Sequence, residues 1–550
     1  MKRIRLYWNT LRYLRPVQIF GRIAFRLSRP KPDVSPHPRR ATVVRPIHYH
    51  EWREPSLIEP QIARFLGTTA ALATPSDWRD PQRSALWLYN AHYFDDLLAR
   101  DAVDRRSWHI ELVGRWIAEN PPGSGIGWAP YPSSLRIVNW IIWLCRTDGI
   151  ATETIIQSLA VQTRYLSRRL EHHILGNHLF ANAKALVFGG LFFDGKEADE
   201  WYRLGIALLK RELAEQILAD GGHFELSPMY HHIILADMLD LIAIHAAFGR
   251  SCPSDWLDVV RKMFGWAEAM THPDGQISLF NDAAFGVSAT LTQLRGYAAE
   301  LGIRLDRTDQ AELTRLTESG YMRMQRNGAC VIADVANVGP DYLPAHAHAD
   351  TLSFELSLDT CRVVVNGGTS EYGTGPERLR QRGTASHSTL MLDGNNSSEV
   401  WSGFRVARRS RIVRCEATAE SDRIRVEAEH DGYARLGGKP MHSRRWTLTD
   451  NGLAVFDRVM WEGEHCIDIF FHLSPDIQAL RSDDGTVMLY KRLDNSVVAR
   501  AVSSLPDQLD IMASSWHPRF GVSLESQSLR IHGRHTLPFE HTMTLAWEPS

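Results

Sequence analysis

The sequence predicts an incomplete α/α toroid followed by an antiparallel β-sandwich, because the hydrophobic period changes once along the chain. Apolar residues recur at helical spacing between about residues 84 and 318, and they alternate after residue 320. No helical segments interrupt the second half, which favours antiparallel pairing of its strands. We therefore expect a lead-in segment at 1–80, a toroid domain at 81–318 and a β-sandwich domain at 319–550.

The lead-in segment is rich in proline and arginine, so we expect it to wrap around the protein and not to form a core of its own. Its basic and aromatic beginning, from Lys2 to Trp8, has the composition of a membrane-surface segment, but we favour ordinary packing on the body of the protein.

The helical half contains consecutive amphipathic segments separated by glycine and proline. Ser133 stands where a helix cap is expected. The clearest segments are Ser133–Asp148, Ala198–Leu218, Asp255–Thr271 and Leu291–Leu301. The β half carries the turn dipeptides of hairpins between alternating runs, at Asn327-Gly328, Asn451-Gly452 and Asp484-Gly485.

The charge balance excludes some classes of partner. The 550 residues contain 62 Lys and Arg against 64 Asp and Glu, a net charge of −2, so a general nucleic-acid binder is not expected. No apolar run reaches the ~18 residues of a membrane-spanning helix, and no Sec signal is visible. These observations predict a cytoplasmic location without an integral membrane segment.

Two clusters in the helical half suggest a site. Asn177 and His178 interrupt an apolar helical run. A polar group that is buried there needs a hydrogen-bond partner or a functional role to offset the cost of its burial. The alternative is a helix start with Asn177 as its cap. Tyr230 follows Ser227-Pro228, which predicts a helix start where the positive end would favour a phenolate. The alternative is an aromatic residue that only packs.

A third cluster opens the β half. His346, His348 and Asp350 alternate just before a predicted strand, as the ligands of a metal or acid–base site would. His348, Asn366 and His387 are candidate ligands of one ion, although asparagine is a poor zinc ligand. A loop between them carries Arg378, Arg380 and Arg382. An amidohydrolase site is disfavoured, because its HxH opens a (β/α)₈ barrel.

Taken together, the segments between about residues 85 and 420 resemble the heparinase II/III superfamily of polysaccharide lyases, which includes the oligoalginate lyases. The resemblance rests on the order and wide spacing of motifs that are each weak: Trp128-Ala-Pro-Tyr131, Ser134, Arg136, Asn139-Trp140, Asn177-His178, Tyr230, Pro273-Asp-Gly275, His346-Ala-His348-Ala-Asp350, Asn366-Gly-Gly368 and His387. That family joins an α/α toroid to an antiparallel β-sandwich, as the change of period also predicts.

The resemblance implies β-elimination of an acidic, uronic-acid-containing polysaccharide. Asn177 would neutralise the C6 carboxylate with help from His346, and Tyr230 would protonate the leaving O4 and could also serve as the base. His178 would be the base for the opposite C5 configuration. Tyr230 would need cationic neighbours such as a histidine or Arg136 to ionise. The expected substrate-binding residues are Tyr131, Arg136, Arg378 and Arg382.

The resemblance implies no required cofactor. Family members often hold a structural ion with residues aligned to His348, Asn366 and His387. Asn366 stands where several of them have aspartate, so we expect zinc to be weak or absent. We expect His348 and His387 to act structurally, by ordering the loop with the three arginines at the mouth of the cleft.

Two other functions stay open. An inverting glycoside hydrolase on the same toroid would need two carboxylates across the cleft, for which Glu225 and Asp282 are candidates. A non-catalytic glycan-binding protein of polysaccharide assembly would need no proton donor. The lead-in resembles members associated with bacterial exopolysaccharide synthesis, whereas family members are commonly periplasmic. The sequence predicts neither the sugar nor the oligomeric state.

Overall fold

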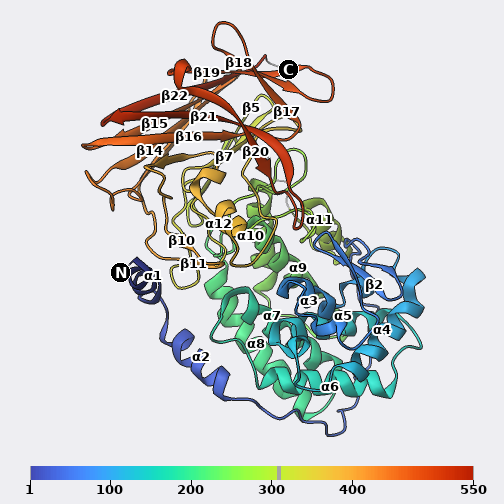
Figure 1. Ribbon diagram of the computed structural model, residues 1–550. Coiled ribbons are helices and arrows are strands. Elements are labelled where there is room, and N and C mark those ends of the chain that lie inside the picture. Colours follow the sequence, from blue (N-terminus) through green and yellow to red (C-terminus); the bar gives the residue numbers. More distant parts are fainter. Residues whose placement is uncertain (1, 306–310, 549–550) are drawn as a thin grey trace.

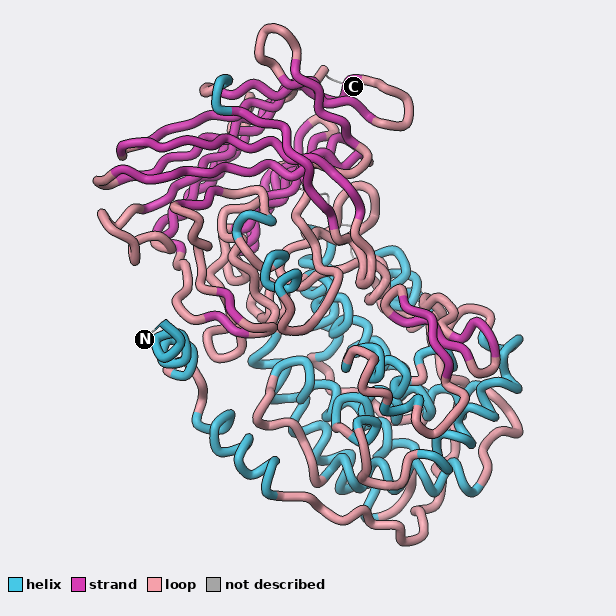
Figure 2. Tube along the Cα trace, viewed as in Figure 1, coloured by secondary structure: helices cyan, strands magenta, loops and turns pink. Residues whose placement is uncertain are grey.

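The computed structural model describes residues 2–305 and 311–548 and separates a helical half from a β half (Figures 1 and 2). The order of the two halves, helices first and antiparallel sheets second, confirms the predicted fold class. Among the described residues, every helix is too short or too polar to span a bilayer.

The helical half is built from helices that pack on the next helix along the chain or on the next but one. Helix α7 lies between α5, α8 and α9, and α9 in turn contacts α10 and α11, which is consistent with an incomplete toroid. The helices are α3 (Ala85–Tyr93), α4 (Arg106–Glu119), α5 (Pro130–Arg146), α6 (Glu153–Ser167), α7 (Gly176–Phe192), α8 (Lys196–Gln216), α9 (Pro228–Ala247), α10 (Trp256–Ala269) and α11 (Leu291–Glu300).

The predicted helices lie close to the observed ones, with one difference at a start. Helix α5 begins at Pro130, so Ser133 lies in its first turn and does not cap it. Proline is favoured at a first helical position because its missing N–H would have no partner there.

The lead-in segment contains elements that the sequence analysis did not predict. Helices α1 (Lys2–Leu11) and α2 (Pro16–Leu27) lie along one flank of the molecule (Figure 1). A small antiparallel sheet follows, formed by β1 (Leu57–Glu59), β2 (Ile62–Phe65) and β3 (Thr68–Ala71).

The β half consists of antiparallel sheets that share one apolar core. The eight-stranded sheet has the order β12 (Ile412–Ala419), β13 (Ile424–His430), β14 (Met441–Thr449), β15 (Gly452–Met460), β22 (Phe539–Ala546), β19 (Val497–Ser503), β18 (Val487–Lys491) and β17 (Ile477–Arg481). The four-stranded sheet has the order β20 (Leu509–Trp516), β21 (Leu524–Thr536), β16 (Glu464–His472) and β9 (Leu390–Leu392). The five-stranded sheet comprises β4 (Leu313–Leu316), β5 (Tyr321–Arg326), β6 (Ala329–Asp334), β7 (Phe354–Leu358) and β8 (Cys361–Val364).

The predicted hairpins are confirmed by the strand pairing. Asn327-Gly328 joins β5 to β6, Asn451-Gly452 joins β14 to β15, and Asp484-Gly485 joins β17 to β18. Strand β13 alternates buried and half-buried residues, as a strand with one face on the core does.

Strand β6 differs because every one of its residues is buried. Val331 and Ala333 face the core of the β half, whereas Cys330 and Ile332 pack with Trp266 of α10. The strand therefore joins the two halves through apolar contacts on both of its faces. The segments that carry the predicted site residues meet beside this junction.

Candidate active site

Asn177 lies in the first turn of α7, where it is held by Glu225. Its backbone N–H donates to Glu225 Oε1 over 3.1 Å, and its Nδ2 lies 3.1 and 3.0 Å from the two carboxylate oxygens. Gly176 precedes it at φ +56°, and a Cβ there would collide with Glu225 Oε1. Helix α7 begins at Gly176, so the alternative of Asn177 as its cap is wrong. The contact instead fixes the amide in one orientation.

His178 lies beside Tyr131 and Glu171. Its ring is 4.3 Å from the ring of Tyr131, centroid to centroid, and its Nδ1 is 3.2 Å from Glu171 Oε1. Burial disfavours the imidazolium, but the Glu171 carboxylate outweighs that effect and raises the pKa of His178. The resemblance placed Tyr131 and His178 in the site, and the structure brings them together.

His346 stands between two buried carboxylates. Its Nδ1 is 2.9 Å from Asp282 Oδ2, and its Nε2 is 3.4 Å from Glu225 Oε2. Because Glu225 also holds Asn177, the two residues that are expected to neutralise a substrate carboxylate share one partner. His346 comes from the loop before β7, so this contact joins the helical and β halves.

Tyr230 lies in the first turn of α9, after the predicted Ser227 cap and Pro228. The Ser227 side chain accepts a hydrogen bond from the Tyr230 N–H, which confirms that prediction. The Tyr230 ring lies 4.0 Å from the His346 ring, centroid to centroid. Asn177, Tyr230 and His346 therefore meet at one place, although 53 and 116 residues separate them along the chain.

A second tyrosine, Tyr372, was missed by the sequence analysis. Its hydroxyl is 3.1 Å from the Tyr230 hydroxyl, and its ring contacts the rings of Phe404 and Phe520. Burial, and then the neighbouring Tyr372, raise the pKa of Tyr230 well above its ordinary value. Cationic neighbours were expected to favour the Tyr230 phenolate, but in this arrangement the raised pKa favours the phenol.

Asp282 is the buried acceptor that connects these groups. It binds His346, His348 through Nε2 at 2.9 Å, and Arg378 through both terminal nitrogens. Burial alone would raise the pKa of Asp282, but the Arg378 guanidinium and the two histidines hold it well below its usual value. Asp282 is therefore an anion that positions its neighbours.

Three arginines predicted to bind substrate are fully buried and already bound, so that prediction is wrong. Arg136 donates to Gln162 and to the carbonyls of His92 and Gly127. Arg378 binds Asp282, and Arg382 donates to the carbonyls of Ala347 and Gly403. These bonds hold the walls of the site, because a buried guanidinium needs acceptors on all sides. Of the three arginines in the predicted loop, only Arg380 is exposed.

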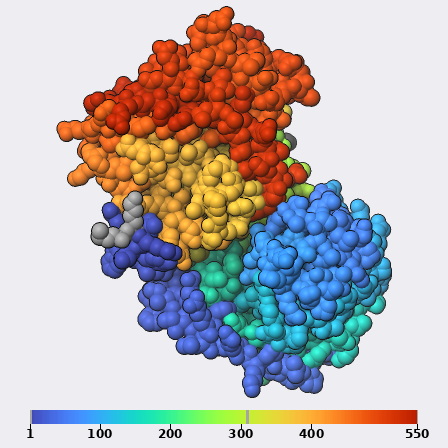
Figure 3. All heavy atoms as spheres, in the orientation of Figure 1, coloured from blue at the N-terminus to red at the C-terminus, as the bar shows by residue number. Residues whose placement is uncertain are grey.

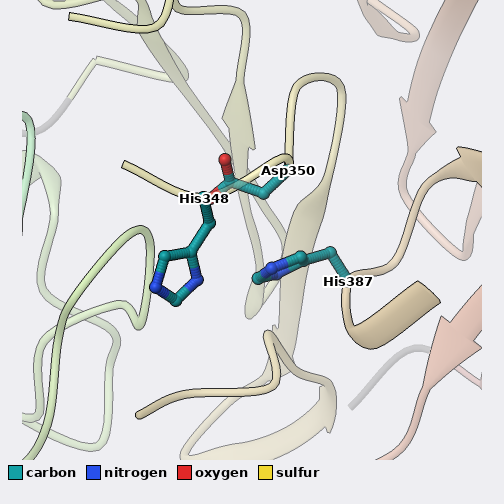
Figure 4. Close-up of side chains that lie close together, drawn as sticks. All are labelled: His348, Asp350 and His387. Carbon is teal, nitrogen blue, oxygen red and sulfur yellow. The ribbon is translucent and has the colours of Figure 1, made fainter. Parts of the chain in front are cut away.

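The predicted metal ligands are rearranged. Figure 4 shows the rings of His348 and His387 facing each other, with Asp350 beside them; the donor atoms of these three residues lie within 4.8 Å of one another. Asn366 is instead a partner of His387, since its Oδ1 accepts a hydrogen bond from His387 Nδ1 at 2.7 Å. Among the residues the structure describes, His348 Nδ1 and His387 Nε2 are buried without a hydrogen-bond partner.

These unpartnered nitrogens fit a metal ion. A histidine that ligates a metal commonly gives its second nitrogen to a carboxylate or a carbonyl, as His348 gives Nε2 to Asp282. Burial raises the pKa of Asp350 to about 6. A cation would favour the charged form of Asp350 and offset the free-energy cost of burying that charge.

Comparisons with known proteins agree with the fold. The family model described as Heparinase II/III N-terminus matches residues 108–301, and the model described as Heparinase II/III-like, C-terminal matches residues 308–548. A heparin-sulfate lyase of Bacteroides stercoris is 28% identical over 266 residues, which are 43% of this chain and 40% of that protein. A heparin-sulfate lyase of Bacteroides thetaiotaomicron is 27% identical over 341 residues, 53% and 48% of the two chains. The chain thus spans less than half the length of these curated relatives.

Solved structures show the same fold at low sequence identity. A crystal structure of heparinase III has a TM-score of 0.67 and 19% identity, and the match covers 88% of this chain and 80% of that one. A heparan sulfate lyase from Pedobacter heparinus has a TM-score of 0.59 and 18% identity, with 97% and 88% coverage.

Arg136→Met should destabilise the fold without weakening substrate binding. The change leaves buried carbonyls and the Gln162 side chain without a donor, which should lower the free energy of unfolding by about 3 kcal/mol or more. Urea unfolding measures this loss, and exposed Arg203→Met is the control. A stable variant with a raised KM would return Arg136 to the substrate-binding set.

Asp282→Asn should also destabilise the fold, by about 3–5 kcal/mol, because Arg378 would be left buried without its counter-charge. The pKa of Asp282 is lower in the fold than in the unfolded chain. Its stabilising contribution is therefore complete above the unfolded pKa of about 4 and is lost as pH falls towards the folded pKa.

Unfolding should be compared between about pH 5 and pH 3, where the wild type should lose stability that the variant already lacks. Exposed Asp507→Asn is the control. Equal unfolding free energies for Asp282→Asn and the wild type at neutral pH would show that the ion pair is not required.

Proposed function

Because the chain belongs to the heparinase II/III superfamily, we propose that it is a polysaccharide lyase that cleaves a uronic-acid-containing glycan by β-elimination. The observation that carries this proposal is the meeting of Asn177, Tyr230 and His346 at the junction of the two halves. A carboxylate neutraliser and a proton donor must both reach one sugar ring, and this arrangement supplies both.

The neutralising step falls to Asn177 and His346. The Asn177 amide carries two N–H bonds, so it can keep one directed at Glu225 and offer the other to the C6 carboxylate. His346, between Glu225 and Asp282, can offer its Nε2–H to the same carboxylate. Hydrogen bonds to that group stabilise the enolate-like transition state, which makes the C5 proton removable. Glu225 is a positioning residue for both donors.

Tyr230 is the proposed acid. Its raised pKa keeps the phenol protonated, so it can protonate O4 as the C4–O4 bond breaks. Tyr372 lies within hydrogen-bond distance of that hydroxyl and can return a proton to it. The C5 proton has to be removed before the C4–O4 bond breaks. Tyr230 would be the base as well as the acid if a phenolate took the C5 proton first and then passed it to O4, and His178 would be the base for the opposite C5 configuration. The raised pKa of His178 means that its neutral, basic form grows as pH rises above the ordinary histidine range.

The two carboxylates that a hydrolase would need, Glu225 and Asp282, are already bound to other side chains. Glu225 and Asp282 are 1% and 0% exposed, and each holds side chains of the site. An inverting hydrolase needs one carboxylic acid that donates a proton and one carboxylate that activates water. Asp282 is bound to Arg378 and has a lowered pKa, which suits neither task. The geometry therefore favours elimination.

The proposed substrate is an acidic polysaccharide. The curated relatives are heparin-sulfate lyases, so heparan sulfate is the first substrate to test, followed by alginate, hyaluronan, chondroitin and bacterial exopolysaccharides. Elimination leaves an unsaturated C4–C5 bond that absorbs in the ultraviolet, whereas hydrolysis produces new reducing ends without that absorbance.

Tyr230→Phe should abolish turnover on the substrate that this screen identifies. The change removes the hydroxyl but keeps the ring against His346, so folding and substrate binding should persist while the rate falls by about 10²–10⁴. Product absorbance measures the rate, and Tyr490→Phe on β18 is the matched control. Full activity of Tyr230→Phe would remove the tyrosine from the mechanism.

We propose in addition that His348, Asp350 and His387 hold a structural zinc ion, with Asn366 orienting His387. Imidazole nitrogens and a carboxylate oxygen are ligand types that zinc takes in proteins, and these three residues would hold the ion. The ion would fix the loop before β7, which carries His346, against the segment before β9. It would supply stability and no catalytic step.

Elemental analysis of the purified protein should find about one zinc per chain, and chelation should lower the melting temperature. Asp350→Asn should lose both the zinc and the chelator sensitivity, whereas exposed Asp341→Asn should keep them. A protein purified without metal, whose melting temperature is unchanged by added zinc, would leave a hydrogen-bonded histidine cluster in place of the ion.

A further inference from the structure

The first two helices turn large apolar side chains to the solvent. Ile4 and Trp8 of α1 are 75% and 69% exposed, and Phe20 and Leu27 of α2 are 69% and 80% exposed. Tyr7, Leu11, Val17, Ile19 and Ile23 are exposed on the same two helices. Scattered exposed apolar residues are ordinary, but a continuous group on neighbouring helices indicates a binding surface.

The inward faces of these helices carry few apolar side chains, whereas an ordinary surface helix turns most of its apolar residues inward. Asn9 and Gln18 are only 8% and 6% exposed, and Gln18 Nε2 donates to the Tyr342 carbonyl at 3.0 Å. At 3.6 residues per turn, Gln18, Gly21 and Phe25 share the inner side of α2, so Phe20 and Leu27 lie on the opposite side. A helix that packs only on its own protein places its apolar stripe inward. These apolar stripes therefore have another partner.

The charged residues of the segment that contains the two helices are all positive. Residues 3–32 contain eight arginines and lysines and no aspartate or glutamate, in a chain whose net charge is −2. All eight side chains are exposed. On α2, Arg26 lies at the side of the apolar stripe, where it would meet a layer of negative charge if the stripe were buried. Arg22 lies nearer the inner side of the helix, but its side chain is exposed.

We propose that α1 and α2 form a docking face for an anionic lipid bilayer, with the apolar stripes among the acyl chains and the arginines at the headgroups. Aliphatic and aromatic side chains flanked by arginines are what an interfacial helix requires. A second copy of the chain would bring two positive faces together in a symmetric dimer. A soluble polyanion would pair with the arginines but leave Ile4, Phe20 and Leu27 in water.

The docking face is attached to both halves of the protein. The Trp401 indole N–H donates to the Thr10 hydroxyl, so α1 is held on the hairpin of β10 (Val400–Trp401) and β11 (Arg405–Val406). Helix α2 is held on the helical half, where the Phe25 and His173 rings lie 4.3 Å apart and Arg15 pairs with Glu215. Figures 1 and 3 show the two helices on one flank, spanning the junction.

Sedimentation of the full chain with lipid vesicles tests this proposal. The protein should bind vesicles of phosphatidylcholine mixed with phosphatidylglycerol, bind pure phosphatidylcholine far less, and lose binding as salt rises. Phe20→Ser with Leu27→Ser should weaken binding by about tenfold or more. Arg22→Gln and Arg26→Gln should each weaken it by about fivefold at low salt. All four side chains are exposed, so melting temperatures should not change.

Leu493→Ser and Val103→Ser are the matched controls, since these side chains are 86% and 77% exposed elsewhere on the surface. They should leave vesicle binding unchanged. The proposal is overturned if the wild type does not sediment with anionic vesicles, or if the α2 variants bind them as well as the controls do. It is also overturned if those variants only convert a dimer into a monomer in the absence of lipid.

Discussion

The buried carboxylate of Asp282 is the interaction on which the rest of the site depends. It lies in the helical half and binds His346, His348 and Arg378, all of which come from the β half. Removing two opposite charges from water costs several kcal/mol per ion, and only good geometry with further hydrogen bonds repays that cost. The arrangement does so because every oxygen of Asp282 has charged or polar partners. Correct docking of the two halves is therefore required before this anion can be buried.

This constraint also positions the chemistry. One ring nitrogen of His346 is hydrogen-bonded to Asp282, and the other lies near Glu225. These contacts fix the plane of the ring, and Tyr230 lies against it. Glu225 holds Asn177 at the same time. Two carboxylates that take no direct part in the proposed reaction thus set the orientation of three groups that do. Orientation of this kind supplies much of the rate enhancement available to an enzyme.

The sequence predicted those features that depend on local physics. The Asn-Gly turns, the change of hydrophobic period and the Ser227-Pro228 helix start each need only neighbouring residues. The prediction that three arginines bind substrate failed because their partners are not visible in the sequence. Arg136 and Arg382 donate mostly to backbone carbonyls, which every residue has and no sequence pattern reveals. Tyr372 was missed because only the folded chain brings it to Tyr230.

The arrangement around His387, with Asp350 near the two histidines and Asn366 hydrogen-bonded to His387, was also hidden from the sequence. Alternation along an expected strand placed His346, His348 and Asp350 on one side, but β7 begins only at Phe354 and the preceding residues form a loop. In that loop His346 turns to Asp282 and Tyr230, while His348 and Asp350 turn to His387. Alternate residues point to the same side only within a strand, so the spacing of residues in a loop does not predict which of them lie together.

The docking face and the active site share a structural connection. The β10–β11 hairpin that holds α1 has Gly403 and Phe404 in its turn. The Gly403 carbonyl accepts hydrogen bonds from Arg378 and Arg382, and the Phe404 ring lies 5.2 Å from that of Tyr372. On the other side, Phe25 of α2 lies against His173, two residues after the Glu171 that holds His178. The two helices are thus connected, through one intervening segment each, to both sides of the candidate site. A surface that held α1 and α2 would also restrain the relative position of the residues that must close on one sugar ring.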